Sequence, residues 1–86
     1  MKTNYLMLKE LLGKYKPEER GIISKNEYEL VKETLCLSEM DILQLRNLID
    51  FTVAHLGRSE DLADWDRMSA IVYVIDGCIF EQGCEV

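Results

Sequence analysis

Proline, glycine and long apolar runs are all scarce in this sequence. One proline and five glycines occur in 86 residues, which favours long regular elements over a loop-rich fold. No run of about 18 apolar residues is present, so no transmembrane span is predicted. The opening residues, MKTNYLMLKE, are interrupted by charge and lack a small-residue cleavage site, which argues against a secretory signal. We therefore expect a single domain over residues 1–86, cytoplasmic and without membrane contact.

Basic residues are also scarce in the second part of the chain. Residues 38–86 hold only three of the ten basic side chains but ten of the sixteen acidic ones, so the net charge of −6 arises there. Phosphate binding depends on lysine and arginine, and we therefore expect no binding of duplex nucleic acid. Three interpretations of the acidic half remain: attraction of a basic protein partner, imitation of a phosphate backbone, and solubility alone.

Helical periodicity is the main pattern that the sequence does contain. Apolar residues recur at spacings of three and four in four segments. This pattern predicts an all-α fold, a small compact bundle of about four helices at approximately 4–15, 25–36, 39–56 and 60–81. Because the connections are short, neighbouring helices are expected to run antiparallel.

Polar residues mark the expected helix ends. Thr3 or Asn4 is the predicted cap of the first helix, and Ser24 with Glu27 has the spacing of a capping box at the second. The predicted caps of the third and fourth helices are Ser38 and Ser59. Gly57 is the predicted end of the third helix.

The three cysteines do not form a motif that binds metal or carries redox chemistry. Cys36, Cys78 and Cys84 lack the C-x2-C or C-x4-C spacing that is typical of zinc sites, and also the C-x-x-C redox spacing. On one helix, Cys78 and Cys84 would lie about 9 Å apart along the axis, too far for a disulfide unless the chain turns at Gly83. We interpret Cys36 and Cys78 as small buried hydrophobic residues, and we expect no metal and no cofactor.

Other candidates for chemistry are weak. His55, the single histidine, has no nucleophile or metalloprotease frame around it, so a role at a helix end is favoured over catalysis. The acids Glu60, Asp61, Asp64 and Asp66 crowd the expected start of a helix, where acids favour the dipole, instead of converging from several elements as a cation site requires. No enzyme activity is predicted.

A helix-turn-helix is the remaining nucleic-acid interpretation. The second and third predicted helices are joined by Cys36–Ser38, a connection short enough for that motif. In the expected recognition helix, Arg46 is the basic residue that could contact DNA bases, and the helix also contains several acids. DNA recognition is therefore disfavoured.

The last predicted helix is apolar on two sides. Its broad side carries Trp65, Met68, Ile71, Val72, Ile75 and Ile79. A narrower stripe on the opposite side consists of Leu62, Tyr73 and Phe80, flanked by Asp66 and Asp76. Either this helix is the central one, wrapped by the other three, or the narrow stripe binds a partner. These five residues are the predicted partner-binding residues.

Together these patterns predict a small non-catalytic interaction module. It would bind a partner protein through apolar helix surface and its acidic C-terminal half. An inhibitor of a nucleic-acid-binding protein, encoded by a phage or mobile element, is one concrete form of this hypothesis. The alternative is a structural homodimer, larger homo-oligomer or assembly subunit, followed by a metal- or thiol-dependent protein and by a helix-turn-helix DNA binder.

Overall fold

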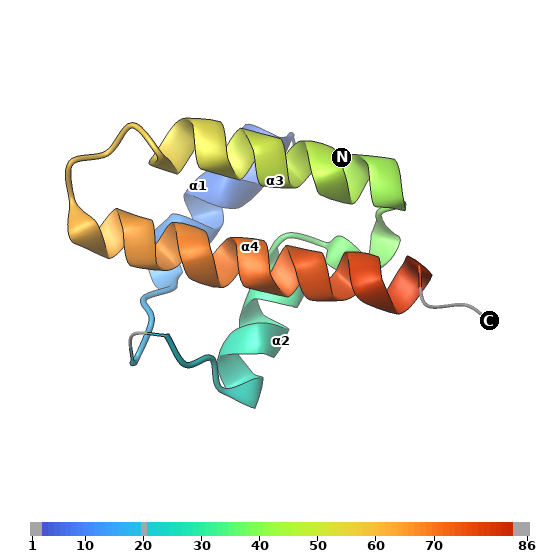
Figure 1. Ribbon diagram of the computed structural model, residues 1–86, viewed down its shortest axis with the longest axis horizontal. Helices are drawn as coiled ribbons and strands as arrows, with labels where there is room; N and C mark the ends of the chain where they lie inside the picture. The colour runs from blue at the N-terminus through green and yellow to red at the C-terminus, as the bar shows by residue number, and fades with distance from the viewer. Residues whose placement is uncertain (1–2, 20, 84–86) are drawn as a thin grey trace.

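Four α-helices make up most of the part of the chain that the computed structural model describes, residues 3–19 and 21–83 (Figure 1). They are α1 (Asn4–Lys14), α2 (Lys25–Thr34), α3 (Ile42–Leu56) and α4 (Leu62–Gly83), and the short 3₁₀ turn η1 (Leu37–Glu39) precedes α3. Within the described ranges there is no β-strand, and an isolated bridge pairs Glu19 with Ile22. The predicted all-α fold of four helices is confirmed.

The antiparallel pair of α3 and α4 is the most extensive helix packing in the bundle (Figure 1). α1 contacts α2 and α3, while α2 also contacts α4. Every helix contributes to one common core, in which the fully buried side chains are Leu8, Leu11, Val31, Leu35, Leu37, Leu45, Leu48, Thr52, Ile71, Val74 and Ile75. Burying an aliphatic side chain of this size stabilises a fold by about 1.5–3 kcal/mol, so this core holds the bundle together.

The first two helix starts are capped as the sequence predicts. Thr3 accepts a hydrogen bond from the backbone N–H of Leu6 at 3.3 Å. At α2, the Ser24 hydroxyl accepts from the N–H of Glu27 at 3.2 Å, and the Glu27 carboxylate accepts from the N–H of Ser24 at 2.7 Å. The predicted capping box is therefore confirmed.

The start of α3 differs from the prediction. Asp41, not Ser38, is its N-cap: the Asp41 carboxylate accepts from the N–H of Gln44 at 2.8 Å, and the Gln44 side chain accepts from the N–H of Asp41 at 2.9 Å. Ser38 lies within η1, and η1 directly follows Cys36. The left-handed backbone of Cys36 (φ 54°) interrupts the helical path. A reciprocal pair of hydrogen bonds at Asp41 satisfies two backbone donors, which a single serine does not.

This change also removes the short turn on which the helix-turn-helix hypothesis depended. α2 ends at Thr34, and α3 begins at Ile42. The connection is therefore longer than the three residues predicted, and it contains η1. Gly57 ends α3 as predicted, with its N–H donating to the carbonyl of Val53 at 2.8 Å.

The start of α4 is also later than predicted, at Leu62 and not near residue 60. Ser59 still serves the first turn, because its hydroxyl accepts from the N–H of Asp61 at 3.1 Å and donates to the Asp64 carboxylate at 2.6 Å. The Asp61 carboxylate accepts from the N–H of Ala63 at 2.9 Å. The side chains of Ser59 and Asp61 thus both accept hydrogen bonds from free backbone N–H groups at the start of α4.

The buried carboxylate of Glu27 connects α2 to the segment that follows α1. Besides capping Ser24, it accepts a hydrogen bond from the N–H of Glu18 at 2.9 Å, and the residue is only 5% exposed. The hydrogen bonds from the Ser24 and Glu18 backbones lower the pKa of Glu27. Tyr15 lies close by, where burial and then the charge of Glu27 raise its pKa to about 12. The path of the chain from α1 to α2 therefore depends on one ionised side chain.

We predict that Glu27→Gln destabilises the protein by roughly 1–3 kcal/mol at neutral pH, because hydrogen bonds to a charged acceptor are lost. The folded carboxyl has the lower pKa, so the unfolded chain takes up the proton first. The contribution of Glu27 to stability is complete above the unfolded pKa of about 4.3 and is lost as the pH falls through the folded pKa.

Urea unfolding of the wild-type and Glu27→Gln proteins between about pH 3 and pH 7 measures this contribution. Glu29→Gln, at an exposed acid of the same helix, is the control. An equal deficit for Glu27→Gln at both ends of the pH range would contradict the prediction.

Gly77 allows α2 to approach α4 closely. A Cβ atom at this position would lie 2.9 Å from the Tyr28 hydroxyl oxygen, whereas the nearest ring carbons would be at 3.6 and 3.7 Å, ordinary contact distances. The same hydroxyl lies 4.0 Å from the Cys78 sulfur. α4 continues without interruption through Gly77. Glycine lowers the stability of the helix here, but its missing side chain leaves room for Tyr28.

We predict that Gly77→Ala has opposite effects in two backgrounds. With Tyr28→Phe, which removes the crowded oxygen, alanine stabilises α4 by up to about 1 kcal/mol through helix propensity. When Tyr28 is kept, the new Cβ displaces the Tyr28 hydroxyl, and the cost of this displacement cancels or exceeds the gain in helix stability. Chemical denaturation of the four proteins of this double-mutant cycle gives the coupling energy. Gly13→Ala in α1, where a Cβ meets nothing within 4 Å, is the control and should stabilise in both backgrounds. Absence of coupling would show that the close approach does not require glycine.

Candidate functional site

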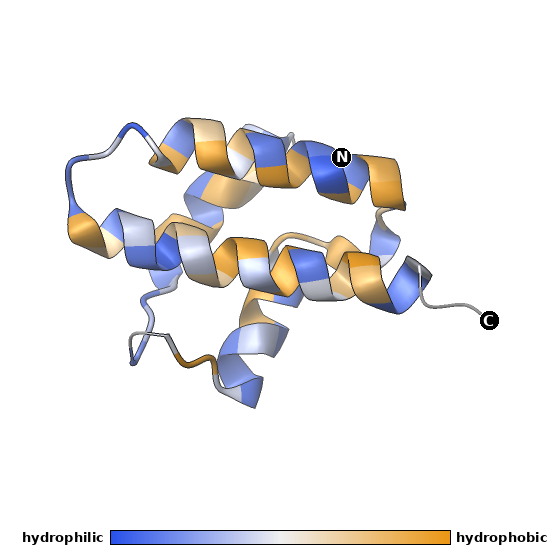
Figure 2. Cartoon of the chain, viewed as in Figure 1, coloured by the Kyte–Doolittle hydropathy of each residue, from blue (hydrophilic) through white to orange (hydrophobic). Residues whose placement is uncertain are grey.

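The three apolar residues of the predicted narrow stripe on α4 are all exposed. Leu62 is 70% exposed, Tyr73 64% and Phe80 70%. They follow one side of a 22-residue helix, so the distance from the first to the last is about 27 Å along the axis. Figure 2 shows hydrophobic residues along most of α4, interspersed with hydrophilic ones. We call these three residues the α4 stripe.

The core side of α4 is rotated slightly from the predicted one. Its buried residues are Ala70, Ile71, Val74, Ile75 and Cys78, whereas Met68, Val72 and Ile79 are half-buried at its margins. Trp65, predicted to be on the core side, is 45% exposed, and its indole N–H donates to the carbonyl of Ser59 at 2.8 Å. The indole therefore lies over the α3–α4 connection and widens the apolar surface next to Leu62.

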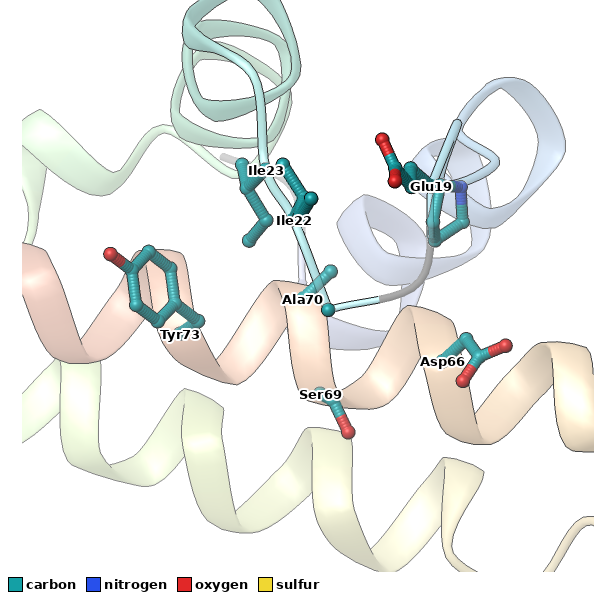
Figure 3. A pocket seen from close by; sticks show the side chains of 9 residues that line it. Glu19, Ile22, Ile23, Asp66, Ser69, Ala70 and Tyr73 are labelled. Atoms are coloured by element: carbon teal, nitrogen blue, oxygen red, sulfur yellow. The ribbon is translucent and has the colours of Figure 1, made fainter.

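A groove of about 430 Å³ separates α4 from the connection between α1 and α2. Its α4 side is formed by Asp66, Ser69, Ala70 and Tyr73, and its opposite side by Pro17, Glu19, Gly21, Ile22 and Ile23. Figure 3 shows Ile22, Ile23 and Tyr73 toward one end of this groove, and Glu19 and Asp66 toward the other. The structure thus brings Asp66 and Tyr73, two predicted partner-binding residues, to the edge of one concave surface.

The remaining predicted partner-binding residue with charge, Asp76, is exposed on the same side of α4 as the stripe. Asp66 is half-buried and takes part in an interaction within the chain. Further acids lie near the two ends of α4, at Glu60 and Glu81. Lys32 of α2 reaches Glu81 at 3.9 Å, a partly exposed pair that contributes little to stability. The exposed side of α4 therefore carries three large apolar side chains, with Asp66, Ser69 and Asp76 beside them.

The acids at the start of α4 have structural partners. Asp64 accepts a hydrogen bond from Ser59 and pairs with Arg67 at 2.8 Å; the Ser59 hydrogen bond, followed by the Arg67 contacts, lowers the pKa of Asp64. Arg67 also donates to the carbonyl of Tyr15 at 3.2 Å, which ties α4 to the end of α1. Within residues 3–19 and 21–83, no group of three or more His, Cys, Asp and Glu side chains is placed to hold a metal ion.

Cys78 is buried and Cys36 is half-buried, whereas Cys84 lies outside the described residues. Burial raises the pKa of the Cys78 thiol, which leaves it protonated and unreactive near neutral pH. Cys36 lies in the turn after α2. Neither Cys36 nor Cys78 is part of a disulfide.

His55 belongs to an exposed aromatic contact between α1 and α3. Its ring stacks on Phe51 with centroids 5.8 Å apart, and Tyr5 meets it edge-on at 5.8 Å. Both of these ring contacts are aromatic, and the packing gives His55 a structural role. Its predicted place at the end of α3 is observed.

A second groove, of about 640 Å³, lies among α1, α2 and the residues up to the first turns of α3. Met7, Leu30, Cys36 and Met40 supply apolar lining, and side chains of both charges surround them. None of its lining residues belongs to α4. It is therefore separate from the predicted partner-binding residues.

Comparison with known proteins adds no relative from which a function can be taken. No protein-family model matches the chain, and neither a curated protein nor a solved structure does. Among the helices that the structure describes, none has both the length and the apolar character needed to cross a bilayer.

Sequence reasoning did not find the half of the groove that lies outside α4. Glu19, Gly21, Ile22 and Ile23 precede a helix start and carry no motif of their own. The available signal was Ile22, a large apolar residue close to the predicted capping box at Ser24, in an otherwise polar connection. Its 56% exposure shows that it is not needed by the core.

We predict that the two sides of α4 respond differently to truncation. Ile75→Ala, at a fully buried residue, should lower the free energy of unfolding by about 2–4 kcal/mol. Phe80→Ala, at a residue that is 70% exposed, should change it by no more than about 0.5 kcal/mol. Thermal and urea unfolding, with sedimentation to follow association, test both. If Phe80→Ala unfolds the protein as severely as Ile75→Ala and leaves association unchanged, the α4 stripe is part of the core.

Proposed function

We propose that this protein is a non-catalytic interaction module that binds a partner protein through the α4 stripe and the acidic surface around it. The observation that carries this proposal is the exposure of Leu62, Tyr73 and Phe80, each at 64–70% on one side of one helix. Single exposed apolar residues are ordinary, but a line of large ones rimmed by polar groups is typical of a protein-binding surface. Aromatic residues in particular supply much of the binding energy at interfaces.

The chemistry of the partner follows from the charge. The net charge is −6, and the acidic excess lies in the half of the chain that contains α3 and α4. A basic surface on the partner would be attracted to it and would associate faster at low salt. Nucleic-acid-binding proteins carry such surfaces. Inhibition of a protein of this class, by covering its basic surface, is the concrete form of the proposal.

A homodimer through the α4 stripe is the competing function, because the same exposed residues can meet those of a second copy. Two copies bring two net charges of −6 together, which opposes association, most strongly at low salt. A basic partner experiences the opposite effect. The charge therefore favours a different protein as the partner.

We predict that Leu62→Asp combined with Phe80→Asp abolishes partner binding without unfolding the protein. The control carries Leu43→Asp and Val53→Asp, two exposed apolar residues of α3. Partners retained by the tagged protein and the control, but lost by the α4 variant, should then be purified and titrated calorimetrically. A loss of affinity of at least about ten-fold, which corresponds to about 1.4 kcal/mol, is expected.

Two outcomes would contradict this prediction. If the α4 variant retains the same partners as the control, the stripe is not the interface. If sedimentation shows the protein to be a dimer that the α4 variant alone converts to a monomer, the homodimer is the correct function. Asp76→Lys should weaken binding of a basic partner mainly at low salt, since rim charges act through screened electrostatics.

A further inference from the structure

The groove beside the α4 stripe has two chemically different ends. Ile22, Ile23 and Tyr73 lie toward one end, while Glu19 and Asp66 lie toward the other (Figure 3). Ala70 lies on α4 between them. A ligand that matches both ends needs an apolar part joined to a positive charge.

We propose that this groove receives a lysine or arginine side chain from a basic segment of the partner. The aliphatic stem would lie against Ile22 and Tyr73, and the cationic head would lie near the exposed carboxylate of Glu19. Long basic side chains commonly bury the stem on apolar surface while the charge stays at the rim. The inference rests on the proposed function, because it assigns the charged contact of the same interface.

The apolar end of the groove is exposed and can hold such a stem. Ile22 is 56% exposed and Tyr73 is 64% exposed, so both have free surface. The cavity of about 430 Å³ lies within the range of about 300–1,000 Å³ that is usual for ligand clefts. It has room for one long side chain and part of the backbone that carries it.

The acidic end supplies charge complementarity. Glu19 is exposed at the rim of the groove, and it provides the carboxylate on which the proposal depends. Asp66 adds negative charge on the α4 side, although it already takes part in an interaction within the chain. The net charge of −6 favours the approach of a basic partner and repels a second copy of the chain.

The wall opposite α4 is held in place before any partner binds. The Glu27 carboxylate accepts from the N–H of Glu18 at 2.9 Å, directly before Glu19. Arg67 donates to the carbonyl of Tyr15 at 3.2 Å, which fixes the start of the same connection against α4. A preformed wall reduces the entropy lost on binding.

The groove is continuous with the α4 stripe because Tyr73 belongs to both. A partner segment that lies along α4 would therefore cover Leu62, Tyr73 and Phe80 with apolar residues and direct one basic side chain into the groove. This arrangement requires a segment that is both apolar and basic. An amphipathic helix with basic flanks has that composition.

The test uses the full chain, labelled with ¹⁵N, and two 18-residue helical peptides as probes. Both peptides have leucine along one face; one carries lysine and arginine elsewhere, and the other carries glutamate at those positions. We expect the basic peptide to bind at least about ten-fold more tightly than the acidic one at low salt. Its amide shift changes should include Ile22, Ile23, Ala70 and Tyr73.

Two pairs of variants locate the contact. Glu19→Lys should lower the affinity for the basic peptide at least about five-fold. Glu39→Lys makes the same change of net charge on η1 and should change this affinity by less than about two-fold. Ile22→Ser should weaken binding, whereas Leu43→Ser, at another exposed apolar residue, should not. All four positions are exposed, so unfolding measurements should show the variants to be folded.

Several results would overturn the inference. Equal weakening by Glu19→Lys and Glu39→Lys would mean that net charge alone acts. Failure of the basic peptide to bind at about 1 mM, or equal binding of both peptides, would also contradict it. If Leu62→Asp with Phe80→Asp abolishes binding while Glu19→Lys and Ile22→Ser do not, the groove is excluded and the proposed function stands. Failure of the proposed function is recognised separately, by α4 variants that keep the natural partner.

Discussion

The carboxylate of Glu27 determines the path of the least regular part of the described chain. It accepts hydrogen bonds from the N–H groups of Ser24 and Glu18, so it caps α2 and at the same time anchors the residues that come from α1. Buried backbone N–H groups need such partners. Without this anchor, Glu18 would lose the hydrogen bond that holds it near α2. The groove wall at Glu19, Ile22 and Ile23 therefore depends on an interaction that lies outside the groove.

The bundle uses α4 in two ways. One side, centred on Ile71, Val74 and Ile75, is buried against the other helices. The opposite side keeps Leu62, Tyr73 and Phe80 in solvent. In a chain of this size, a helix at the margin of the bundle can bury only one side, and the α3–α4 pair leaves the other side free (Figure 1). A surface of this composition suits association because covering it removes apolar area from water.

Most of the fold was predictable because helix periodicity and capping are local properties. All the predicted helix boundaries lie within three residues of the observed ones. The largest difference is at the start of α3, where the N-cap is Asp41 and not the predicted Ser38. Side-chain spacing alone does not show which of several polar residues caps a helix. The choice depends on which hydrogen bonds form at the same time, as in the reciprocal pair of Asp41 and Gln44.

The amino-acid sequence by itself determined the four helices, the capping box at Ser24 and Glu27, the acidic half and the apolar stripe of Leu62, Tyr73 and Phe80. Each of these follows from residue types at fixed spacings along one segment. Only the tertiary structure decided that the stripe is exposed and that Trp65 lies at the surface. It also placed Gly77 against Tyr28 and brought Glu19 and Ile22 opposite α4. The last two are contacts between segments far apart in the chain. They depend on how the helices pack and on where one buried carboxylate holds a connection, which no local pattern encodes.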